Sequence, residues 1–174
     1  MTHPTCASEA PKSCLMRGTA TFTIELLSTE TNTAEVRRLV EAMRGADALI
    51  LSTAAYHGTL AGVTKNALDF AQFLARDERP YLDGWVVGLI STAGGERAAA
   101  NTTDAMVHVV HALRGVVAPS MVTIPRAWQR SNSEGNTTDE AYGKRLDKLG
   151  KLVVEMAEGL NPEDRSIEAV GVAV

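Results

Sequence analysis

Residues 46–70 read ADALILSTAAYHGTLAGVTKNALDF, and their pattern changes twice. The first eight form a short continuous apolar run, which is typical of a strand buried on both faces of a sheet. A polar turn that contains Gly58 follows. Apolar side chains then recur at helical spacing at Val63, Ala67, Phe70, Ala71 and Leu74. The stretch therefore predicts a buried strand, a loop and an amphipathic helix.

The same alternation extends in both directions along the chain. Apolar and β-branched runs predict further strands at 19–27 (TATFTIELL), 84–92 (GWVVGLIST) and 119–125 (PSMVTIP). Helical spacing predicts a helix that ends at Gly45, one that ends at Gly115, and a last one carrying residues from Tyr142 to Met156. Buried strands that alternate with helices indicate a parallel sheet covered on both faces. We expect one domain at 19–160, a poorly ordered segment at 1–18 and a frayed tail at 161–174.

Composition excludes several classes of function. The chain has 174 residues and a net charge of −4, so it lacks the basic stripe of a nucleic-acid-binding protein. No apolar stretch reaches the roughly 18 residues of a membrane helix, and no secretory signal is visible. Cys6 and Cys14 make a poor metal site, and His108 and His111 lack a third ligand. We expect a reduced, cytoplasmic protein with no metal site.

Ligands of parallel sheets bind at the carboxyl ends of the strands, so the loops after Thr53 and after Thr92 are the candidate site. In the first loop Tyr56 offers a flat ring and His57 a polar one, while Gly58 lets a ligand approach the backbone. These residues could hold a flat heteroaromatic group. An exposed turn whose side chains pack on their own rim explains the spacing equally well.

The first loop and the helix after it resemble the NADPH-dependent FMN reductase family, whose pattern is P-E-Y-N/H-G-S followed by K-N-A-L-D. Tyr56, His57 and Gly58 match, and so does the run from Lys65 to Asp69, whereas Thr59 replaces the serine and two alanines replace the Pro-Glu pair. The segment GLISTAGGERAA is similar to the family's S-T-x-G-G loop. The resemblance covers about residues 20–160.

The resemblance implies a flavodoxin-like, three-layer α/β/α fold and an oxidoreductase that moves hydride from NADPH or NADH to FMN. The acceptor would be a flavin, a quinone, an azo compound or a metal oxyanion. The implied FMN-binding residues are Tyr56, His57, Gly58, Thr59, Thr92, Ala93, Gly94 and Gly95. We name no acid–base catalyst, because the cofactor carries the chemistry in such enzymes. The helix that begins at the K-N-A-L-D run lies at the subunit contact in the family, so we expect a homodimer or homotetramer.

The family's first strand and its G-S-x-R-x-x-S phosphate loop have no counterpart here, because TATFTIELL aligns with the second strand. Two explanations stay open, a shortened member or a start that lies late in a longer chain. The polar stretch STETNTAE, residues 28–35, is better explained as a helix cap, with Asn32 and Glu35 at capping-box positions. If TATFTIELL instead moved beside ADALILST, Ser28 to Thr33 would stand where a phosphate belongs.

Two other functions remain compatible with the sequence. The absent phosphate loop would suit a shortened paralogue that serves as a non-catalytic interaction subunit. An electron-carrier flavoprotein without pyridine-nucleotide activity is the second alternative. Flavin content, and whether NADPH reduces the bound flavin, distinguish these two alternatives from an NADPH-dependent oxidoreductase.

Overall fold

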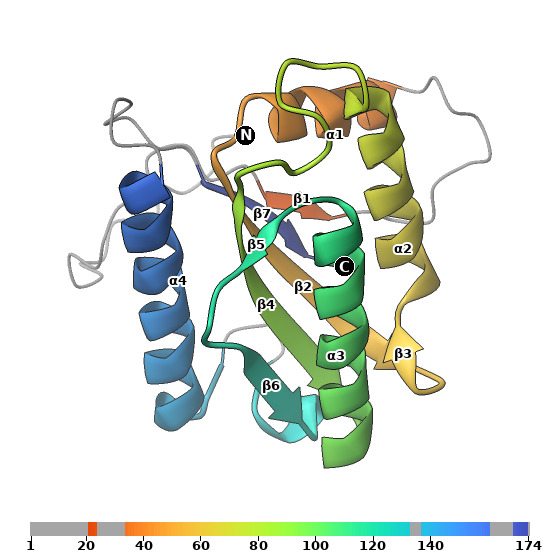
Figure 1. The fold of residues 1–174 in the computed structure, drawn as a ribbon. Helices are drawn as coiled ribbons and strands as arrows, with labels where there is room; N and C mark the ends of the chain where they lie inside the picture. The colour runs from red at the N-terminus through yellow and green to blue at the C-terminus, as the bar shows by residue number, and fades with distance from the viewer. Residues whose placement is uncertain (1–20, 24–33, 133–136, 161–168, 174) are drawn as a thin grey trace, which may run out of the picture.

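The computed structural model describes residues 21–23, 34–132, 137–160 and 169–173. They form a mostly parallel sheet between two layers of helices (Figure 1). The strands are β1 (Thr21–Thr23), β2 (Ala48–Tyr56), β3 (Thr59–Leu60), β4 (Val86–Ala93), β5 (Val116–Val117), β6 (Val122–Pro125) and β7 (Ala169–Ala173). The helices are α1 (Ala34–Arg44), α2 (Gly62–Asp69), α3 (Glu96–Ala112) and α4 (Glu140–Leu160), with 3₁₀ turns η1 (Phe70–Leu74) and η2 (Ala127–Gln129). The predicted three-layer architecture is confirmed.

The sheet has the order β1-β7-β2-β4-β5. β5 pairs with the start of β4 and β6 with its end, so the two short strands share one edge of β4. β3 is antiparallel and folds back on the end of β2 as a hairpin. All other pairings are parallel, as the apolar runs predicted.

Each face of the sheet has its own apolar core. On one face α1, α2, η1 and α3 pack against Leu49 and Leu51 of β2 and Val87 and Leu89 of β4. On the other face α4 packs against Ala48, Val86 and Val122. The apolar stripe predicted for the first helix is confirmed, because its four members are all buried: Val36, Leu39, Val40 and Met43.

The tail departs from the sequence prediction. Residues 169–173 were expected to fray, yet they form β7, which pairs with β1 on one side and with β2 on the other. β1 corresponds to the family's second strand and β2 to its third. β7 lies between them, in the position of the family's first strand, for which the sequence shows no counterpart (Figure 1). Its sequence AVGVA contains two β-branched residues, which suit a strand paired on both sides.

The alternative in which TATFTIELL moves beside β2 is also wrong, because Thr21–Thr23 pairs with β7 and not with β2. The remaining residues of that predicted strand, the segment 1–18 and most of STETNTAE lie outside the described residues.

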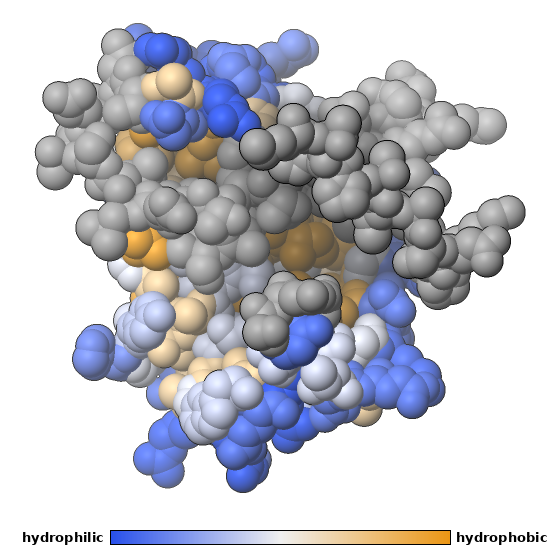
Figure 2. Space-filling model, turned by 180° about the vertical axis from the view of Figure 1, so that it is seen from behind, coloured by the Kyte–Doolittle hydropathy of each residue, from blue (hydrophilic) through white to orange (hydrophobic). Residues whose placement is uncertain are grey.

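Apolar side chains dominate the interior of the described elements. In the view from behind, hydrophobic residues are visible at the centre of the face and hydrophilic ones gather over its lower part (Figure 2). No described helix is both long enough and apolar enough to cross a bilayer.

Candidate functional site

The two loops singled out by their sequence lie side by side at the carboxyl edge of the sheet. Ala54 of β2 stands opposite Thr92 of β4, so the loops that leave these strands start at the same level. The hydroxyl of Thr92 reaches the carbonyl oxygen of Thr53 at 3.5 Å. The prediction that Tyr56–Thr59 and Thr92–Gly95 meet at one end of the sheet is confirmed.

The polar turn predicted around Gly58 is a tight hairpin. β2 continues to Tyr56, which pairs with Thr59 of β3. The two residues between them have positive φ angles, 51° at His57 and 92° at Gly58, which is the conformation of a type I′ turn. The hairpin projects the ring of Tyr56 into solvent, where 61% of the residue is exposed.

Buried hydroxyl groups fix this hairpin to the helix that follows it. The Thr53 and Thr64 hydroxyls are 2.7 Å apart, and the backbone N–H of Ala61 donates to Thr53 Oγ1 at 3.2 Å. Thr53 and Thr64 are almost fully buried, so these bonds are shielded from water. These bonds restrain the hairpin relative to α2, in a loop that lacks the proline of the family pattern.

The second loop joins β4 to α3 through two glycines. Gly95 caps the helix with an extended backbone, and its carbonyl accepts the N–H of Ala99. A side chain built on Gly95 would meet no atom within 4 Å, so a ligand can approach the backbone there. Beneath the loop, the Ser91 hydroxyl lies 2.9 Å from that of Thr103 and donates to the carbonyl oxygen of Ala99.

A third segment reaches the same edge, following the strand predicted at 119–125. From the sequence, Trp128 in this segment could either line a ligand pocket or pack beneath the loop. Pro125 ends β6 opposite Ala93 of β4. Arg126 follows in the left-handed region, with φ 52°, and turns the chain into η2. Trp128 of η2 then lies near Gly94, since a Cβ built on Gly94 would be 3.6 Å from its ring. The segments after β2, β4 and β6 therefore all contribute to one edge.

Lys65 and Asp69, which are four residues apart in α2, form an ion pair. His108 and His111 are both exposed on α3, and no group of three metal-ligating side chains occurs in the described part of the chain.

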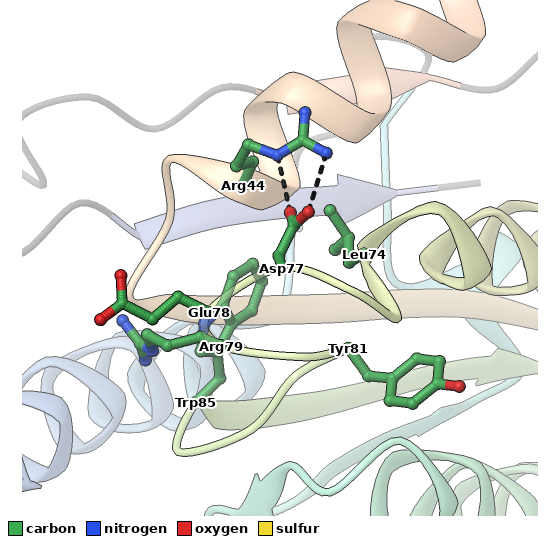
Figure 3. A pocket seen from close by; sticks show the side chains of 7 residues that line it. All are labelled: Arg44, Leu74, Asp77, Glu78, Arg79, Tyr81 and Trp85. Atoms are coloured by element: carbon green, nitrogen blue, oxygen red, sulfur yellow. Dashed lines mark hydrogen bonds and ion pairs between the residues drawn. The ribbon is translucent and has the colours of Figure 1, made fainter.

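A separate pocket of about 560 Å³ lies at the opposite, amino end of the sheet (Figure 3). Trp85, just before β4, and Arg44, at the end of α1, both line it. Arg44 donates to both carboxylate oxygens of Asp77, and this bond raises the pKa of the guanidinium further above its ordinary value. Arg79 is paired with Asp47. Because both arginines are already neutralised, the pocket offers no free cation for a phosphate.

Residues 15–129 match the model of the NADPH-dependent FMN reductase family. The match covers well over half of the chain, and the protein belongs to this family. Its described fold agrees with that membership, since the strands that carry the family's two loops are neighbours in the sheet.

Among its relatives, an FMN-dependent NADPH-azoreductase of Staphylococcus aureus is 31% identical over 101 residues, which are 58% of this chain and 50% of the relative. The chain thus spans about half the length of the curated relatives it matches. The flavoenzyme FerB of Paracoccus denitrificans, an NAD(P)H:(acceptor) oxidoreductase, has a similar fold with a TM-score of 0.59 and 22% identity, covering 73% of this chain and 69% of that one. The NADH:FMN oxidoreductase EMOB is similar with a TM-score of 0.52 and 22% identity, covering 78% and 65% of the two chains.

The described edge fits the ring of a flavin better than its phosphate. It offers the exposed ring of Tyr56, the open backbone at Gly95 and the rigid hairpin at Gly58. A phosphate needs several converging N–H groups or cations, and the described loops show no such cluster beyond the start of α3.

Proposed function

We propose that this protein is an oxidoreductase that binds FMN at the carboxyl edge of β2 and β4, takes hydride from NADPH or NADH, and passes electrons to an acceptor. The acceptor is a free flavin, a quinone, an azo compound or a metal oxyanion. The observation that carries the proposal is the register Ala54 opposite Thr92, which brings the two loops typical of the family together. The similarity to an FMN-dependent NADPH-azoreductase and to the NAD(P)H:(acceptor) oxidoreductase FerB supports the same class.

Each loop has a distinct part in holding the cofactor. The ring of Tyr56 offers a stacking face, and the backbone of His57, Gly58 and Thr59 offers hydrogen-bonding groups to the edge of a flat ring. Gly94 and Gly95 let that ring lie close to the main chain, and Ala93 forms the apolar floor. Bound FMN supplies the hydride-accepting ring, and the chain supplies orientation and shielding from water.

A matched pair of variants tests the site. Gly95→Leu places a side chain in the open space at the candidate site, whereas Gly159→Leu does so at the far end of α4, where a Cβ also meets no atom within 4 Å. We expect Gly95→Leu to weaken flavin binding by at least about tenfold, which is about 1.4 kcal/mol, and Gly159→Leu to leave it unchanged. Quenching of flavin fluorescence gives the affinities of both variants.

FMN and riboflavin are titrated in parallel, because their difference measures the contribution of the phosphate. We expect a small difference, since the sequence contains no counterpart of the family's G-S-x-R-x-x-S phosphate loop. A wild-type protein that binds neither flavin while remaining folded contradicts the proposal and favours a non-catalytic subunit. A bound flavin that NADPH and NADH do not reduce favours an electron carrier.

We further propose that α2 and η1 form the contact of a homodimer, or of a tetramer built from dimers. Phe73 is 52% exposed and stacks on Phe70 with ring centroids 6.3 Å apart, which leaves an apolar surface beside the Lys65–Asp69 pair. Such exposed aromatic residues are enriched at interfaces.

We expect Phe73→Glu to convert the oligomer to a monomer, because a carboxylate would be buried without a partner. Light scattering coupled to gel filtration gives the mass. Met121→Glu is the control, since Met121 is an exposed apolar residue before β6 and should not change the mass. A wild-type monomer at micromolar concentration would contradict the assembly.

A further inference from the structure

Trp128 has the largest exposed fraction among the large hydrophobic residues that the structure describes. Its exposed fraction is 65%, compared with 61% for Tyr56. An indole that remains in water forgoes the free energy its burial would give. The position of this ring therefore calls for a physical reason.

The exposure does not result from a loosely held segment. Arg130 Nε donates to the carbonyl oxygen of Pro125 at 3.1 Å, and the Ser131 hydroxyl donates to that of Ala127 at 3.0 Å. Arg130 also pairs with Asp139 and lies over the ring of Tyr142, 4.7 Å from its centroid. The backbone on both sides of Trp128 is thus tied to the end of β6 and to the start of α4.

The rigid segment holds the indole over the second candidate loop. A Cβ built on Gly94 would lie 3.6 Å from Trp128 Cζ3 and 3.8 Å from Cη2. The ring edge therefore lies on the side of Gly94 where a side chain would project, while most of the residue faces solvent. Pro125, three residues earlier, stands opposite Ala93 in the sheet, so the ring belongs to the same edge as the flavin-binding loops.

We propose that Trp128 is a binding residue that stacks against the isoalloxazine ring of a flavin held by the loops after β2 and β4. The inference rests on the proposed function and adds a side chain from η2, the turn after β6, which lies outside the two loops of the family motif. Offset and edge-to-face aromatic pairs form at centroid separations of about 4.5–7 Å. A flat ring lying along the Gly94–Gly95 backbone would come within that range of the indole, whose edge lies next to the side-chain position of Gly94.

Lumiflavin, which is the flavin ring without ribityl phosphate, is the probe that isolates this contact. We expect Trp128→Ala to weaken lumiflavin and FMN by the same factor, about tenfold, and Trp128→Phe to retain most of the affinity. Equal factors for the two flavins show that the ring and not the phosphate is lost. Because Trp128 is mostly exposed, its replacement should leave the thermal midpoint of unfolding unchanged.

Emission from the bound flavin gives a second readout, because an indole in contact with the ring quenches it. We expect bound lumiflavin to emit more strongly in Trp128→Phe than in the wild type. Trp85→Phe is the control, since the chain contains two tryptophans and Trp85 is buried at the opposite end of the sheet. This control should leave both affinity and emission as in the wild type.

Three results separate the possible failures. Wild-type affinity and emission in Trp128→Ala overturn the role of the indole while the flavin site stands. If Trp128→Ala weakens the binding of NADP⁺ alone, the indole contacts the nicotinamide and not the flavin, and the inference is also overturned. Failure of the wild type to bind either flavin overturns the proposed function, and this inference with it.

Discussion

Gly171→Pro is expected to lower the free energy of unfolding by at least about 3 kcal/mol, and the midpoint of thermal unfolding by about 10 °C for a chain of this size. Gly171 lies in the middle of β7, opposite Thr21 of β1 and Ile50 of β2. Because strands pair with β7 on both sides, a proline there removes a ladder hydrogen bond whichever neighbour the N–H faces. The carbonyl left without a donor adds to the cost.

Gly62→Pro is the matched control for this substitution. Gly62 is the first residue of α2, a position that favours proline, and the preceding Ala61 has φ −59° and ψ 141°, which a following proline accepts. We expect this variant to be as stable as the wild type or slightly more stable. Urea unfolding followed by circular dichroism compares the two, and equal stability of Gly171→Pro and the wild type would show that β7 does not belong to the sheet.

Gly88→Val is expected to destabilise the fold by about 3 kcal/mol, at the upper end of the cost of overpacking, and Gly88→Ala by about 1–2 kcal/mol. A Cβ on Gly88 would lie 2.7 Å from Ile50 Cδ1 and 2.8 Å from Val153 Cγ2. Ile50 is only partly buried and can move its terminal methyl group. Val153 is fully buried in α4, so the helix itself must shift away from the sheet.

Gly150→Ala is the control on the same helix. A Cβ there would meet no atom within 4 Å, and alanine in a helix interior is favoured over glycine by roughly 0.5–1 kcal/mol. We therefore expect opposite signs for the two alanine variants in chemical denaturation. A neutral Gly88→Ala would mean that α4 does not pack closely on β4.

The elements with a strong local pattern could be predicted from the sequence. β2 and β4 are continuous apolar runs, and α1, α3 and α4 show apolar residues at helical spacing. β7 could not be predicted, because AVGVA is short and its partners lie at the other end of the chain and in its middle. β5 has two residues, too few to show any period.

The candidate site was predictable in part for the same reason. The loops at Gly58 and Gly95 follow strong strands, and their meeting at one edge results from the parallel sheet. The approach of Trp128 to Gly94 depends on the left-handed turn at Arg126, a conformation that arginine rarely adopts. No spacing in the sequence signals such a turn.

The interleaving of β7 between β1 and β2 also bears on how the protein is made. β1 is the first described strand and β7 the last, so the pair joins two segments that lie far apart in the sequence. Synthesis proceeds from the N-terminus, and pairings between distant segments form slowly. β2, β4 and β6 can pair and pack with their helices as soon as they leave the ribosome. The edges of β1 and β2 that face β7 stay unpaired until β7 has been synthesised. Nascent chains therefore expose unpaired strand edges until β7 has been synthesised, and a chaperone that shields such edges would act on this protein before that point.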